Sequence, residues 1–247
     1  MSAAAPVEKD TPRRAMVLAA GLGLRMRPIT LTTPKPLIPI AGRSMLDRAL
    51  DALDAHGIGE VVVNGHHLAD ALGRHLAGRD RPKVRLCVES ERLETGGGVR
   101  NALPLLGDAP FFVLNGDILW QDGAQPALAA LALAWDAQQM DALLLLHPVA
   151  TALGYAGAGD FHRRDDGRLA RRRDGEPAPL LFAGLQILHP RLLADAPGGA
   201  FSLNLLYDRA IAGGRLAGIV HDGRWCHVGT PADIPAAEAF LGDDTGG

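Results

Sequence analysis

The chain has 247 residues, enough to bury a sizeable core in one large α/β domain or in a domain with a small annex. Its net charge of −3 gives no reason to expect nucleic acid as a partner, and no signal-peptide pattern or membrane-length apolar run indicates a membrane partner. The two cysteines, Cys87 and Cys226, are too few and too far apart for a disulfide framework, which favours a cytoplasmic location.

From residue 15 to residue 148, predicted strands alternate with predicted helices. Residues 1–14, rich in alanine, proline and charge, are expected to form a flexible tail before them. The predicted strands are Ala15–Ala20, Glu60–Asn64, Val84–Glu89, Phe111–Leu114 and Ala142–His147. The predicted helices are Ser44–His56, Leu68–Leu76, a short helix that ends at Leu103, and Ala124–Ala137. This α/β alternation predicts a doubly wound, mostly parallel sheet with ligands at the carboxyl ends of its strands.

The regular alternation of predicted strands and helices ends after Pro148. A glycine-rich loop at 154–159 comes first, and short strands are expected on both sides of the turn at Asp165–Gly167. The remaining predicted elements are strands at Phe182–Leu188, Leu216–Val220 and Trp225–Val228 and helices near Pro190–Ala194, Leu203–Ala212 and Pro231–Phe240. We interpret residues 149–241 as a smaller part that closes over the core of residues 15–148, with a second tail at 242–247.

A glycine-rich, basic loop follows the first strand directly. Gly21 and Gly23 leave room for the backbone to approach a ligand, and successive free N–H groups suit phosphate oxygens. Arg25 can bind phosphate bidentately, and Lys35 can act as a point charge. The loop therefore predicts a polyphosphate site, with an ordinary glycine turn as the alternative.

Two commoner phosphate loops do not fit this stretch. The chain contains no G-x-x-x-x-G-K-[ST] sequence. The dinucleotide pattern G-x-G-x-x-G fails because Met26 stands in its last glycine position, and its acidic partner is missing because the second strand ends at Asn64.

Two further stretches carry candidate chemistry. Asp117, in Asn115-Gly116-Asp117, is expected at the carboxyl end of a strand, where a carboxylate can hold Mg²⁺ against phosphates; a simple turn is the alternative. The triplet Gly96–Gly98, before a predicted helix, allows a flat base or sugar to lie against the backbone; a flexible loop is the alternative.

Together these motifs resemble the sugar-1-phosphate nucleotidyltransferases. The resemblance rests on Gly21-Leu22-Gly23-Leu24-Arg25-Met26-Arg27-Pro28, on Pro34-Lys35-Pro36-Leu37, and on the later motifs at Leu93–Gly98, Asn115–Asp117 and Trp225–Thr230. Members of this family join a nucleoside triphosphate to a sugar 1-phosphate and release pyrophosphate. The resemblance implies a Rossmann-like core with a small C-terminal sugar-binding annex.

The resemblance also implies roles for individual residues. Arg25, Lys35 and Asp117 are expected to be catalytic, with Arg25 at the departing pyrophosphate and Lys35 at the α-phosphate. The expected nucleotide-binding residues are Ala19, Ala20, Gly21, Gly23, Arg25, Lys35, Asn64, Gly96, Gly97 and Asn115. Glu94, Asp160 and Gly184 are expected to bind the sugar, and Arg163 or Arg164 is a candidate for the cation that contacts the sugar phosphate.

One position departs from the family pattern. Where the family has an aspartate as the second metal ligand, this chain has His227. Asp117 and His227 are therefore the expected metal ligands, with Mg²⁺ or Mn²⁺ as the cofactor, and imidazole favours the softer ion. A softer preferred metal, Mg²⁺ held by one carboxylate, and a weakened enzyme all remain open.

Length and motif order match best the short bacterial members of the family. That match implies uridylyl transfer from UTP to N-acetylmuramate 1-phosphate, in cell-wall recycling. Guanylyl or thymidylyl transfer to mannose 1-phosphate or glucose 1-phosphate is the alternative, and a nucleotide-binding regulatory subunit without turnover is an alternative of another class. The chain is expected to be a monomer or a weak oligomer.

Overall fold

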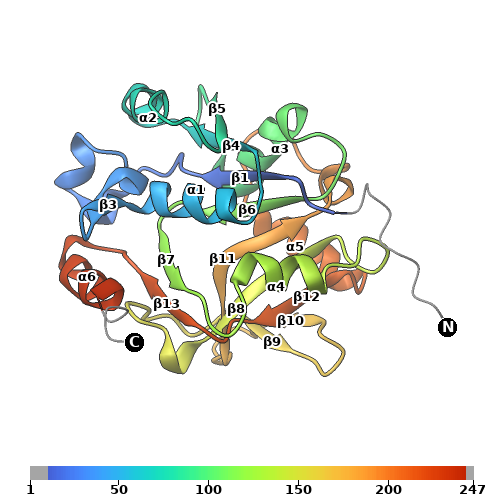
Figure 1. Ribbon diagram of the computed structural model, residues 1–247. Helices are drawn as coiled ribbons and strands as arrows, with labels where there is room; N and C mark the ends of the chain where they lie inside the picture. The colour runs from blue at the N-terminus through green and yellow to red at the C-terminus, as the bar shows by residue number, and fades with distance from the viewer. Residues whose placement is uncertain (1–10, 243–247) are drawn as a thin grey trace.

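The computed structural model describes residues 11–242, which form a sheet flanked by helices (Figure 1). The predicted tails at 1–14 and 242–247 lie largely outside the described residues, although β1 (Arg14–Leu18) already begins at Arg14. None of the described helices is both long and apolar enough to cross a membrane.

The main sheet is mixed but mostly parallel, as predicted. Across the sheet the order is β5 (Lys83–Val88), β4 (Glu60–Gly65), β1, β6 (Phe111–Asn115), β11 (Leu180–Leu188), β8 (Ala142–Pro148) and β12 (Leu216–Val220). Strands β1, β4, β5 and β6 pair in parallel, β11 is antiparallel to both β6 and β8, and β12 pairs in parallel with β8. The carboxyl ends of β1, β4 and β6 therefore meet at one edge.

Helices cover both faces, as a doubly wound sheet requires. One apolar cluster joins the sheet to α1 (Met45–Ala55), α2 (Ala69–Leu76) and α4 (Ala127–Ala134), and Figure 1 shows α1 and α4 in front. A second cluster joins the opposite face to α3 (Glu94–Leu106) and α5 (Leu203–Ala212). Helix α1 illustrates the local cause: Ser44 Oγ accepts the N–H of Asp47 at 3.0 Å, and Leu46, Leu50 and Leu53 are buried at helical spacing.

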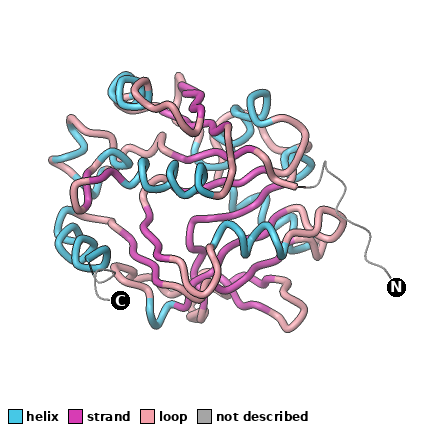
Figure 2. The backbone as a smooth tube through the Cα atoms, viewed as in Figure 1, coloured by secondary structure: helices cyan, strands magenta, loops and turns pink. Residues whose placement is uncertain are grey.

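Residues after Pro148 share the sheet of the core. The predicted turn at Asp165–Gly167 joins β9 (Phe161–Arg163) to β10 (Leu169–Arg171), and β11 then returns between β6 and β8 (Figure 2). The backbone tube in Figure 2 shows that these strands are continuous with the sheet. The C-terminal part therefore contributes a central strand as well as a cover.

A separate two-stranded ladder connects the two halves near the sheet edge. β7 (Ile118–Gln121) pairs with β13 (Arg224–His227), which places His227 opposite Ile118. A third apolar cluster packs this ladder against the glycine-rich loop, the hairpin β2–β3 (Pro39–Ile40 and Arg43–Ser44) and α6 (Ile234–Gly242). The ladder thus brings the end of the chain to the residues that follow β6.

Two predicted boundaries were wrong. Glu94–Gly98 is the first part of α3 rather than a loop, because the glycines pack too closely against other segments to be free. The helix predicted at Ala124–Ala137 is α4, which is shorter because it begins after Pro126 and the backbone is extended again at Trp135.

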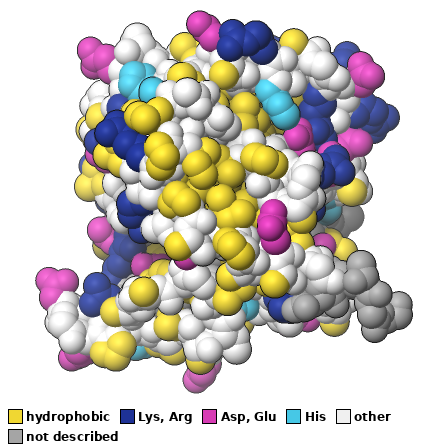
Figure 3. Space-filling view, turned by 90° about the vertical axis from the view of Figure 1, so that its left-hand side faces the viewer, with side chains coloured by type: hydrophobic (Ala, Val, Ile, Leu, Met, Phe, Trp, Pro, Cys, Tyr) yellow, Lys and Arg dark blue, Asp and Glu magenta, His cyan; other side chains and the backbone are white. Residues whose placement is uncertain are grey.

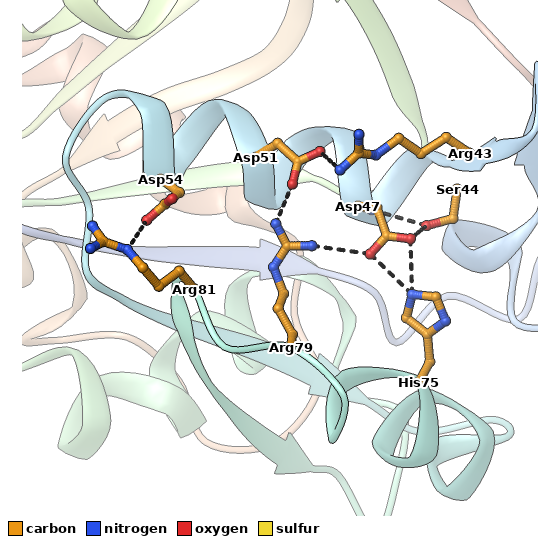
Figure 4. A network of polar contacts seen from close by, with 8 residues as sticks. All are labelled: Arg43, Ser44, Asp47, Asp51, Asp54, His75, Arg79 and Arg81. Carbon is orange, nitrogen blue, oxygen red and sulfur yellow. Dashed lines mark hydrogen bonds and ion pairs between the residues drawn. The ribbon is translucent and has the colours of Figure 1, made fainter.

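A polar network joins α1 to α2 and to the loop between α2 and β5 (Figure 4). The Asp47 carboxylate accepts hydrogen bonds from Ser44 Oγ, His75 and Arg79, and Arg79 also pairs with Asp51. Arg43 pairs with Asp51 and Arg81 with Asp54 on the same side of the helix. None of these residues is among the predicted site residues, and the network serves the scaffold.

Candidate active site

A cleft of about 430 Å³ opens at the carboxyl ends of β1, β4 and β6, within the size range of small-ligand sites. Figure 3 looks onto this side of the molecule and shows hydrophobic side chains gathered at its centre with charged side chains around them. The predicted residues that line the cleft are Ala19, Ala20, Gly21, Lys35, Asn64, Glu94, Asn115 and Asp117. The structure thus brings together residues that lie almost a hundred positions apart in the sequence.

Gly21 and Gly23, in the loop after β1, have different structural roles. A Cβ added to Gly21 would meet nothing within 4 Å, so this backbone faces open space in the cleft. Gly23 has a φ of 57°, and a Cβ there would lie 2.8 Å from a methyl group of Thr30. The Thr30 hydroxyl donates to the Gly23 carbonyl oxygen at 2.8 Å, which fixes the turn. Gly21 therefore leaves room for a ligand, and Gly23 shapes the loop that provides it.

Lys35 and Asp117 form an ion pair in the cleft. The Nζ of Lys35 lies 2.6 Å from Oδ2 of Asp117, and the Lys35 side chain is only 9% exposed, against 35% for Asp117. Gly116 packs its turn against β1, because its N–H donates to the Leu18 carbonyl oxygen at 2.9 Å. The predicted strand-end position of Asp117 is confirmed.

His227 lies beside this ion pair. The β7–β13 register sets it opposite Ile118, the neighbour of Asp117, and its ring stacks on Trp225 with centroids 6.2 Å apart. Burial lowers the pKa of His227, and the positive charges of Lys35 and Arg25 lower it further, while Asp117 opposes them. The imidazole is therefore neutral near pH 7, and a ring nitrogen retains a lone pair.

The donor set here suits a divalent ion that also binds phosphate. Asp117 offers a partly exposed carboxylate and His227 a neutral imidazole, but nowhere in residues 11–242 do three metal-ligating side chains gather. Mg²⁺ in nucleotide sites is commonly held by one or two carboxylates plus the substrate's phosphates. Asp117 and His227 fit that arrangement, with the remaining ligands supplied by substrate and water.

Gly96 and Gly97 do not line the cleft. Both N–H groups donate to the carbonyl oxygen of Phe201, at 2.8 and 3.1 Å, so neither is free for a base. The cleft wall is formed instead by Glu94 and Thr95 of α3 and by Ser202. The glycines make this wall possible, because they let the Phe201 segment pack directly on the helix.

The residues predicted to bind sugar are spread out. Gly184 has a φ of 86° and does not line the cleft, but a Cβ added there would lie 3.2 Å from the side chain of Asn115, which does. Asp160 is half-buried outside it and accepts the N–H of Phe182 at 2.8 Å. Arg163 donates to the Gly218 carbonyl oxygen, and Arg164 lies in the β9–β10 turn.

Several cleft residues were missed in the sequence. Leu22, Pro36, Arg92, Thr95 and Ser202 line it as well. Thr95 lies within the Leu93–Gly98 motif and Arg92 directly precedes it, so the motif itself was a signal for both. Ser202 could not, since it reaches the cleft only through the packing of the segment before α5 on α3.

Comparisons with known proteins agree with this geometry. A model of the nucleotidyl transferase family matches residues 14–168. The N-acetylmuramate α-1-phosphate uridylyltransferase of Caulobacter vibrioides is 44% identical over 239 residues, 95% of this chain and 99% of that protein. The protein of the same name from Neisseria meningitidis serogroup B is 33% identical, with 93% and 98% covered. The solved structure of UDP-glucose pyrophosphorylase complexed with UDP-glucose has a TM-score of 0.78 at 17% identity, over 94% of this chain and 99% of that one, so it shares the fold.

Proposed function

Since the chain belongs to the nucleotidyl transferase family and is a sugar-1-phosphate nucleotidyltransferase, we propose that it transfers a uridylyl group from UTP to N-acetylmuramate 1-phosphate. The observation that carries this choice is the end-to-end match with the Caulobacter relative. That match includes the segments that form the cleft wall and the ladder, in addition to the nucleotide loop.

The cleft supports a reaction without a general base. A phosphate oxygen of the sugar 1-phosphate is already anionic, so it can attack the α-phosphorus directly while the bond to the bridging oxygen breaks and pyrophosphate leaves. We assign Lys35 to the α-phosphate and the exposed Arg25 to the departing pyrophosphate. A divalent ion held by Asp117 and His227 would neutralise phosphate charge there.

The finer assignments belong to the same proposal. We assign the backbone of Ala19–Gly21 to the nucleotide, Glu94 and Gly184 to the sugar end of the cleft, and Asp160 to the support of β11 beside it. In this proposal, residues 15–148 bind the nucleotide and residues 149–241 bind the sugar. The protein is proposed to be a monomer or a weak oligomer. Both cysteines are free thiols, which supports the cytoplasm as the location.

Pyrophosphate release over a grid of substrates tests the proposal. UTP, dTTP and GTP are each combined with N-acetylmuramate, glucose and mannose 1-phosphates, in Mg²⁺ and in Mn²⁺. Release specific to UTP and N-acetylmuramate 1-phosphate is expected, and Asp117→Asn should abolish it. Release with another pair of substrates would support nucleotidyl transfer but contradict the proposed substrates. Nucleotide binding without any release would indicate a regulatory subunit instead.

A further inference from the structure

A buried carboxylate that the mechanism does not use lies behind the nucleotide cleft. Glu89 directly follows β5 and is only 4% exposed, yet no cation within residues 11–242 pairs with it. A buried carboxylate is stable only when hydrogen bonds replace its lost hydration. Its partners therefore indicate what it does.

Both oxygens of Glu89 accept hydrogen bonds from the walls of the cleft. Oε1 accepts from Nδ2 of Asn64 at 2.6 Å, and Oε2 accepts from the N–H of Leu93 at 3.2 Å. Asn64 is 2% exposed at the end of β4, and its Oδ1 accepts the N–H of Ala19 at 2.8 Å. A single chain of hydrogen bonds thus runs from the residue before α3 to the residue after β1.

The Glu89 carboxylate sets the donor-to-acceptor direction of this series of hydrogen bonds. An ionised carboxylate only accepts, so the amino group of Asn64 must face Glu89 and its carbonyl oxygen must face Ala19. With a neutral amide at position 89, at least one donor would face another donor in every orientation. The orientation of Asn64, and with it the hold on Ala19, therefore depends on the two acceptor oxygens of Glu89.

Gly98 shows how closely α3 packs against Glu89 and Asn64. A Cβ at Gly98 would come 2.8 Å from Oε1 of Glu89 and 2.9 Å from Nδ2 of Asn64. The third glycine of the triplet therefore lies directly over the hydrogen bond between the two side chains. The residues at either end of the chain, Ala19 and Leu93, adjoin the loop and the helix start that form opposite sides of the cleft.

We propose that Glu89 is a positioning residue for nucleotide binding, acting through Asn64. It holds the backbone at Ala19 and the start of α3 at the separation that a nucleotide requires. The inference rests on the proposed function, because it takes the occupant of the cleft to be a nucleotide. Glu89 itself does not line the cleft, so its effect reaches the ligand through the two walls.

Two single variants and their combination, which moves the carboxylate from position 89 to position 64, test this role. Glu89→Gln leaves one donor facing a donor, and Asn64→Asp sets two carboxylates against each other. The double variant restores the complete set, because the new carboxylate at position 64 accepts from Ala19 and from the new amide at position 89, whose oxygen accepts from Leu93. We expect each single variant to raise the Kd for UTP roughly tenfold, with a larger effect on KM than on kcat. Because Asn64 itself lines the cleft, the recovery in the double variant is read from the restored hydrogen bonds rather than from nucleotide affinity.

Amide hydrogen exchange supplies a measurement that does not depend on nucleotide. The N–H groups of Ala19 and Leu93 should lose protection in each single variant and regain it in the double variant, with melting temperatures recorded for all three. Single variants that bind the nucleotide as the wild type does, or a double variant whose Ala19 and Leu93 N–H groups stay as unprotected as in the single variants, would overturn the proposal. A wild type that prefers another nucleotide corrects only the proposed substrate, because the same comparison is then made with that nucleotide.

Discussion

Replacing Gly96 with alanine should weaken the wall of the cleft from within the helix. The added Cβ would lie 2.3 Å and 2.5 Å from Cε2 and Cδ2 of Phe201 and 2.9 Å from its carbonyl oxygen. Ordinary contact begins at 3.4 Å, so the buried ring and its backbone would have to move by about 1 Å. The same carbonyl accepts the N–H groups of Gly96 and Gly97, so the movement also strains two hydrogen bonds.

These contacts set the size of the effect. Overpacking of this kind costs about 1–3 kcal/mol, and each of the two hydrogen bonds contributes roughly 1 kcal/mol. Alanine in place of glycine in a helix recovers about 0.5–1 kcal/mol. We expect the free energy of unfolding to fall by about 2–4 kcal/mol, a large share of a typical total of roughly 5–15 kcal/mol.

Urea denaturation followed by circular dichroism measures this change, and Gly21→Ala is the matched control. Gly21 has open space around its Cβ position and a φ outside the left-handed region, so its variant should unfold within about 0.5 kcal/mol of the wild type. Nucleotide affinity should fall in both variants. A Gly96→Ala protein as stable as the wild type would refute the reasoning.

The remaining variants and treatments test charged groups and the metal. Arg25→Ala should keep the melting temperature, because Arg25 is exposed, and lower kcat for pyrophosphate release by about 10²-fold; full turnover would contradict its role. Burial alone would raise the pKa of Asp141, but hydrogen bonds and charges from Arg191 and Arg215 lower it below 3.8. Its contribution to stability is thus present above pH 3.8 and lost as pH falls through the lower folded pKa, so Asp141→Asn should flatten the pH dependence of unfolding between about pH 5 and pH 3. Chelation with EDTA should stop turnover, and His227→Asp should raise the ratio of activity in Mg²⁺ to activity in Mn²⁺; an unchanged ratio would remove His227 from the metal site.

The sequence indicated those parts of the fold that depend on local pattern. Apolar strands ending in Gly21, Asn64 and Asn115 predicted a site at one sheet edge, because parallel strands carry their carboxyl ends to the same side. The position of β11 could not be predicted in this way, because its antiparallel place between β6 and β8 depends on pairing with strands far away in the sequence.

The contrast between local pattern and long-range packing also separates the confirmed and the missed parts of the site. Gly96 and Gly97 were assigned to a ligand because glycine motifs commonly mark one, yet a close approach of two protein segments demands glycine equally well. Only the packing of Phe201 on α3 distinguishes these causes. Glu89 was predicted only as the last residue of a strand, where a lone acid is an ordinary surface residue until its burial is known.

The neutral His227 changes the charge balance of the cleft. An aspartate at this position would set two carboxylates against Lys35 and Arg25, whereas the imidazole leaves Asp117 alone to oppose them. The cleft is then more positive before any metal binds, which favours two anionic substrates held close together. A metal held at the proposed site would, in turn, have one fewer anionic protein ligand and would depend more on the nucleotide's phosphates. Metal and nucleotide should therefore bind this enzyme more cooperatively than they would a site with two carboxylates.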